Sequence, residues 1–171
     1  IRNGSWSGAG AGILVYYGQM SLENLIIENN SSEDYGGGIL IEYSTTNLYN
    51  VVTRDNSAKG GGGMAIRFDS QVDIVESVIE NNFASGKGGG IYISNASPQL
   101  ENVIVKDNVC NGDQGGSGGG IMVEYSELTT VNYVSLINNS GIQGGGIFID
   151  HNSNVVLTNG TIAGNYAESG G

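Results

Sequence analysis

Three side chains, Glu42, Arg67 and Asp69, come closest in this sequence to a catalytic group. Paired carboxylates act as acid and base in glycoside cleavage or hold calcium, and a neighbouring arginine can stabilise developing charge. The three residues fall on neighbouring copies of an internal repeat, which would place them on one outer face of a repeat fold. Acidic residues on a solvated face are usually not catalytic. We therefore predict no catalytic residue and keep this group as the alternative for an enzyme.

Other motifs for ligand or metal binding are incomplete in this sequence. A phosphate-binding loop would need Ser or Thr after Lys87, where the chain has Gly88, and a calcium-binding roll would need Asp where it has Gly120. The single cysteine, Cys110, and the single histidine, His151, cannot build a Cys/His metal site. We predict no metal site and no cofactor. Calcium is left open, although no motif indicates it.

A repeat of about 26 residues would position these side chains. Each copy begins with glycines followed by an aliphatic residue, and the six markers are Ile13, Ile39, Met64, Ile91, Ile121 and Ile147. Successive markers lie 26, 25, 27, 30 and 26 positions apart. Such a period indicates a solenoid, in which each unit buries its apolar face against its neighbours.

Apolar residues within a copy alternate with a period of two, as in Ile39 and Ile41, which indicates strands. Three short strands fit within one copy at ~3.3 Å per residue. The sequence therefore predicts an all-β fold, a right-handed single-stranded parallel β-helix of about six rungs with three strands each. It would span residues 1–171, without a visible cap at either end, as a segment of or unit within a longer solenoid.

Two columns of like residues are expected to stack between rungs. The first is a structural asparagine ladder that follows the third predicted strand: Asn30, Asn56, Asn82, Asn108, Asn139 and Asn165. The second is an aromatic stack two residues after each inward pair: Tyr17, Tyr43, Phe68, Tyr125 and His151, with Asn95 in the remaining rung. Stacked amides and rings stabilise such columns. The alternative for the aromatic stack is a platform for sugar rings.

A third column lies between the two inward residues of the glycine-led strand and should face outward. It forms a candidate contact stripe for a partner: Leu14, Leu40, Tyr92, Met122 and Phe148. Exposed apolar stripes of this kind mark contact surfaces. The alternative is that these residues only suit a pleated surface.

Composition limits the partners. The chain has 17 acidic and 6 basic residues and a formal charge of −11, which argues against nucleic acid and anionic membrane surfaces. No apolar run approaches the ~20 residues of a membrane-spanning helix, so this segment should not insert into a membrane. Flanking rungs of the same or a sister chain are the expected partners, with glycans or a host surface as candidates.

The GGG-Ile-x-Ile openings and the following [Ile/Val/Leu/Thr]-x-x-Asn resemble right-handed parallel β-helix repeats of bacterial surface proteins, including polymorphic outer membrane proteins. Glycine and aliphatic residues replace the alanine and phenylalanine of the latter signatures. The resemblance implies secretion or cell-surface display and an adhesive or structural role. The same fold resembles that of pectate lyases, so a polysaccharide lyase or hydrolase is the first alternative and a self-assembling fibre the second.

Overall fold

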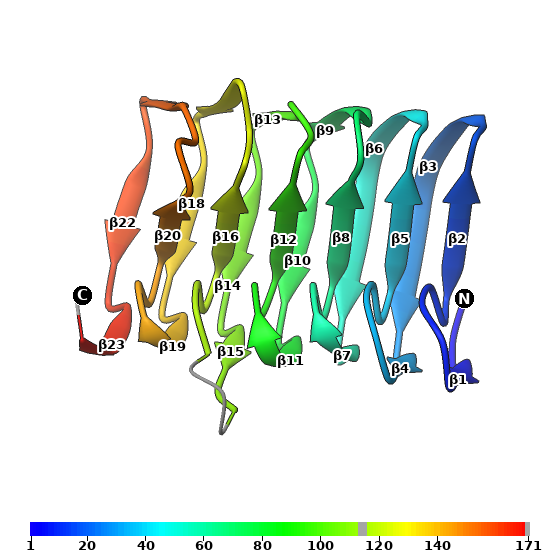
Figure 1. Cartoon of the computed structure of the whole chain (residues 1–171), viewed down its shortest axis with the longest axis horizontal. Helices are drawn as coiled ribbons and strands as arrows, with labels where there is room; N and C mark the ends of the chain where they lie inside the picture. The colour runs from blue at the N-terminus through cyan, green and yellow to red at the C-terminus, as the bar shows by residue number, and fades with distance from the viewer. Residues whose placement is uncertain (113–115, 170–171) are drawn as a thin grey trace.

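The computed structural model describes residues 1–112 and 116–169, which contain 23 short strands and no helix. Every strand pair in this part of the chain is parallel, and the strands stack into three sheets that coil around one axis (Figure 1). The predicted all-β parallel solenoid of about six rungs is thus confirmed. The C-terminal residues Gly170 and Gly171 lie outside the described residues.

The first sheet holds the glycine-led strands: β2 (Ile13–Tyr16), β5 (Ile39–Glu42), β8 (Met64–Arg67), β12 (Ile91–Ser94), β16 (Ile121–Glu124) and β20 (Ile147–Asp150). The chain then turns at the upper edge of Figure 1 into the second sheet. That sheet contains β3 (Gln19–Glu28), β6 (Thr45–Arg54), β9 (Gln71–Val75), β10 (Val78–Glu80), β13 (Gln99–Glu101), β14 (Ile104–Lys106), β17 (Thr129–Asn132), β18 (Ser135–Ile137), β21 (Val155–Thr158) and β22 (Thr161–Ala163).

The third sheet differs from the expected arrangement. The second and third predicted strands of each rung belong to one bent sheet, and the third sheet instead follows the asparagine. It contains β1 (Ser5–Trp6), β4 (Ser31–Ser32), β7 (Ser57–Gly60), β11 (Phe83–Lys87), β15 (Val109–Cys110), β19 (Ser140–Gln143) and β23 (Tyr166–Ser169). Its buried positions carry small residues such as Ala58, Ala84 and Cys110, so no apolar alternation marks it in the sequence.

The core consists of like residues stacked from rung to rung. Ile39, Met64, Ile91 and Ile121 are aligned across four neighbouring strands of the first sheet, and each is at most 1 % exposed. The last rung differs, because Ile162 occupies a core position and is 53 % exposed. Burial of the aliphatic columns supplies the main stabilisation, since apolar area removed from water yields ~25 cal/mol per Å².

The first and third glycines of a GGG run have different structural roles. The first, such as Gly88, has a left-handed backbone (φ 61°), and a Cβ there would lie 2.3 Å from the Ile91 carbonyl oxygen. The third, such as Gly90, lies against the ladder, because a Cβ would meet Asn108 Nδ2 at 3.0 Å and the Gly120 carbonyl oxygen at 2.7 Å. The glycine run and the asparagine that define the repeat are therefore in contact.

The asparagine ladder runs through the buried turn between the second and third sheets. Nδ2 of Asn56 donates to Oδ1 of Asn82 at 3.1 Å, and Nδ2 of Asn82 donates to Oδ1 of Asn108 at 3.0 Å. Each amide also donates to a backbone carbonyl one rung back, as Asn82 does to Thr53 at 3.0 Å. The ladder satisfies backbone groups at a bend that the sheets do not pair.

Charged residues at the ends of the second-sheet strands pair across rungs. Arg54 lies 2.7 Å from Glu28, and Lys106 lies 3.0 Å from Glu80. These partly exposed pairs favour one register over its neighbours but add little stability. Within the described residues, no helix is long and apolar enough to cross a membrane.

Candidate functional site

The aromatic column lies at the corner between the first and second sheets. Tyr17 stacks on Tyr43 with ring centroids 4.6 Å apart, and Tyr43 on Phe68 at 5.1 Å. Tyr125 and His151 form a separate pair at 4.5 Å. Each residue of the column has a left-handed backbone, with φ between 50° and 54°, which points its side chain out of the turn. Asn95 occupies the rung between the two groups.

The group formed by Glu42, Arg67 and Asp69 is only partly assembled. Nη1 of Arg67 lies 3.1 Å from Oε1 of Glu42, and the guanidinium is held over two rings, 3.9 Å from the centroid of Tyr35 and 4.3 Å from that of Phe68. Burial raises the pKa of Glu42, which Arg67 opposes. Asp69 is exposed in the following turn and forms no side-chain hydrogen bond or ion pair with another described residue.

The expected contact stripe is not exposed along its length, which corrects the sequence analysis. Leu40, Tyr92 and Met122 are 2 to 3 % exposed, and Phe148 is partly buried. The first glycine of each run folds back over the outward residue of the next strand, so that a Cβ on Gly36 would lie 2.8 Å from Cβ of Leu40. Leu14 in the first rung remains 53 % exposed. Apart from Leu14, the stripe is therefore a second apolar cluster that the glycine loops cover.

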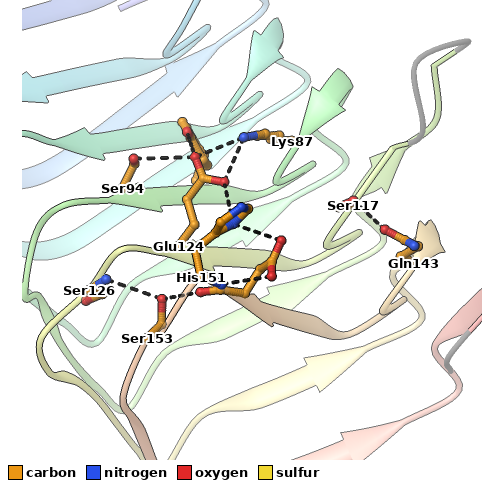
Figure 2. A network of polar contacts seen from close by, with 10 residues as sticks. Lys87, Ser94, Ser117, Glu124, Ser126, Gln143, His151 and Ser153 are labelled. Atoms are coloured by element: carbon orange, nitrogen blue, oxygen red, sulfur yellow. Dashed lines mark hydrogen bonds and ion pairs between the residues drawn. The ribbon is translucent and has the colours of Figure 1, made fainter.

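A polar network centred on Glu124 continues this covered face (Figure 2). Glu124 is 3 % exposed, and its carboxylate accepts hydrogen bonds from Lys87 Nζ at 2.7 and 2.9 Å and from the Tyr92 hydroxyl. His151 Nδ1 lies 3.9 Å from this carboxylate and 2.9 Å from that of Asp150. Burial, with the hydrogen bond to Glu124, raises the pKa of Tyr92 well above its usual range.

The family model for a right-handed beta helix region matches residues 1–162, nearly the whole chain. The chain belongs to the right-handed β-helix family. No curated protein and no solved structure matches it. The family identity of this right-handed β-helix establishes its architecture and does not indicate an activity, because one fold hosts many functions.

This right-handed β-helix has no cluster of three or more His, Cys, Asp or Glu in its described part that could hold a metal ion. Cys110 is a free, fully buried thiol in β15, and burial raises its pKa to about 12. A reactive cysteine requires a lowered pKa and access to solvent. Cys110 is therefore a packing residue of the third sheet.

The centre of the polar network is not predictable from the repeat pattern. Glu124 and Asp150 follow the same column as Glu42, but Lys87 comes from the glycine loop, and its partners in the neighbouring rungs are Gly60 and Ser117. The buried Tyr92 between them was expected on the surface. Only the folding of the loop over the first sheet brings these groups together, and the sequence pattern carries no direct signal of that contact.

We predict that Glu124→Ala destabilises this right-handed β-helix by ~2 to 4 kcal/mol, because it leaves the buried Tyr92 hydroxyl without its acceptor. Urea unfolding measures the change. Glu127→Ala is the matched control, since Glu127 is exposed and forms no side-chain hydrogen bond with another described residue, and it should change stability by less than ~0.5 kcal/mol. Equal effects of the two variants would contradict a structural role for the network.

Proposed function

We propose that this domain is a non-enzymatic structural or adhesive β-helix stalk that acts outside the cell or on its surface. The observation that best supports this proposal is that charged side chains on the outer face of the first sheet form ion pairs with one another. Glu42 pairs with Arg67, and Glu124 is buried against Lys87 and Tyr92. A general acid or nucleophile must reach a substrate. The arrangement supports a packed supporting face better than a reaction centre.

The location and partners of the domain are part of the proposal. The resemblance to surface-protein repeats supports display outside the cell. We propose that a flanking rung of the same or a sister chain covers the last rung, since each unit of a solenoid buries its apolar face against its neighbours. If the covering rung belongs to a sister chain, the domain assembles into a fibre.

Incubation of the protein with neutral and anionic polysaccharides tests whether it cleaves them. We expect no new reducing or unsaturated chain ends, and particles elongated along the solenoid axis in small-angle X-ray scattering. Cleavage that is lost in Glu42→Gln, with the fold retained, would overturn the proposal in favour of a lyase or hydrolase. Regular end-to-end particles under the electron microscope would support the fibre form of the stalk.

A further inference from the structure

The break in the aromatic column coincides with a hollow, which we call the corner pocket. It has a volume of about 210 Å³ and is lined by Asp69, Ser70, Gln71, Asn95, Ala96, Ser97, Tyr125 and Glu127. His151 covers one side of the Tyr125 ring, and the column has no ring at Asn95 next to it. The pocket therefore lies where one ring of the column is missing.

The turn that follows Asn95 is one residue shorter than the turns on either side of it, which deepens the corner pocket. Leu100, Ile74 and Val131 are register partners in the second sheet, and in the Asn95 rung five positions lead from the column residue to Leu100. The rungs on either side need six, from Phe68 to Ile74 and from Tyr125 to Val131. The extra residues place Asp69 and Glu127 as walls on both sides of a shorter turn with a shorter side chain. The hollow is built by the sequence of three neighbouring turns.

Four polar side chains around the corner pocket are unpaired within the described residues, whereas Ser70 and Ser97 are hydrogen-bonded to the backbone. Asp69, Gln71, Asn95 and Glu127 form no side-chain hydrogen bond or ion pair with another described residue. This differs from the outer face of the first sheet, where Arg67 and Lys87 pair with the acidic residues. Two amides and two carboxylates thus remain available to a ligand beside the Tyr125 ring.

We propose that the corner pocket binds one neutral sugar ring of a glycan. A saccharide ring presents C–H groups that pack on the negative face of an aromatic ring, and hydroxyls that both donate and accept. A purely cationic group would leave the amide donors of Gln71 and Asn95 without acceptors. A uronic acid or a phosphate would be repelled by the negative carboxylates of Asp69 and Glu127.

A second hollow adjoins the corner pocket. It has a volume of about 320 Å³, shares Gln71 and Ser97 with the corner pocket, and continues over Asn47, Asp73 and Gln99 of the second sheet. The second hollow lies at the lower end of the ~300 to 1,000 Å³ range of ligand pockets and the corner pocket, at about 210 Å³, lies below it, so each suits at most a single ring. A glycan of two or more residues therefore fits better than a monosaccharide.

This inference rests on the proposed adhesive role, because it requires a sugar to be bound and not cleaved. The test is an array of neutral oligosaccharides of hexoses and N-acetylhexosamines, with polyuronates and sulfated glycans as charged comparators. Hits are titrated by calorimetry against the intact protein. We expect neutral glycans to bind and charged ones not to bind.

Asn95→Tyr is the decisive variant. It supplies the ring type already present at Tyr17, Tyr43 and Tyr125 with the same backbone conformation, so the protein should fold. We expect it to fill the pocket and weaken binding by about tenfold or more. Gln71→Ala should also weaken binding with unchanged thermal unfolding, because it removes one amide from an exposed position.

Tyr43→Asn is the matched control. It removes a ring elsewhere in the column, at a place that lacks the two longer turns on either side of the corner pocket. Glycan affinity should therefore stay within about twofold of that of the parent protein. Absence of binding to every neutral oligosaccharide, binding of charged glycans only, or full binding by Asn95→Tyr would overturn the inference. Each of these results leaves the structural role intact. Cleavage of a bound glycan would instead keep the pocket and refute the proposed non-enzymatic function.

Discussion

Asn82→Ala should destabilise the protein by about 4 kcal/mol, one of the two largest effects that we expect. The side chain is 1 % exposed and forms four hydrogen bonds. It accepts from the backbone N–H and from Nδ2 of Asn56, both at 3.1 Å, and donates to Asn108 Oδ1 and to the Thr53 carbonyl, both at 3.0 Å. Truncation removes all four bonds inside the core, although Asn108 Oδ1 still accepts from the Asn82 backbone N–H and Asn56 Nδ2 still donates to the Ile27 carbonyl. Urea unfolding monitored by circular dichroism measures the loss.

Asn47→Ala is the control for the ladder variant. Asn47 is an exposed strand residue whose side chain forms no hydrogen bond with another described residue, so its truncation should change stability by less than ~0.5 kcal/mol. If both asparagine variants unfold at the same urea concentration as the parent protein, the ladder does not stabilise the solenoid.

Gly88→Ala should cost roughly 3 to 5 kcal/mol or prevent folding. The residue has a φ of 61°, and a Cβ would lie 2.3 Å from the Ile91 carbonyl oxygen and 2.8 Å from the Tyr92 nitrogen. These atoms belong to the backbone of β12, so relief requires the loop to move away from the first sheet. That movement would also expose Tyr92 and Glu124. Thermal unfolding and the yield of folded protein report the effect.

Gly18→Ala provides the comparison at a glycine without this constraint. Its Cβ would meet Val15 Cγ1 at 3.8 Å and the Tyr16 carbonyl oxygen at 3.9 Å, which are ordinary contacts. Alanine there should be neutral or slightly stabilising, because it restricts the unfolded chain. Equal tolerance of alanine at both glycines would refute the tight loop over the first sheet.

The architecture was predictable because it repeats. Six aligned copies with a period-two apolar pattern admit few folds other than a parallel solenoid, and a residue in one copy predicts the place of its counterparts. The asparagine ladder follows from the same logic, since Asn56 and Asn82 occupy equivalent positions. The third sheet was missed because its inward residues, such as Ala58 and Ala84, are too small to give an apolar signal.

The outer surfaces were less predictable because they depend on contacts that the period does not encode. Tyr92 and Met122 have the alternation of exposed residues, yet the glycine loops cover them. Single departures between copies, such as Asn95 in an aromatic column, determine where a hollow forms. Their consequences depend on turn lengths and neighbouring side chains, which become clear only when the rungs are placed in space.

The crystal structure of the protein is the most direct test of this account. It should show parallel rungs in register, a continuous amide column from Asn30 to Asn165, and Glu124 buried beneath Lys87 and Tyr92. Antiparallel pairing of the rungs, or an open cleft in which Glu42 and Glu124 both face solvent, would contradict the account.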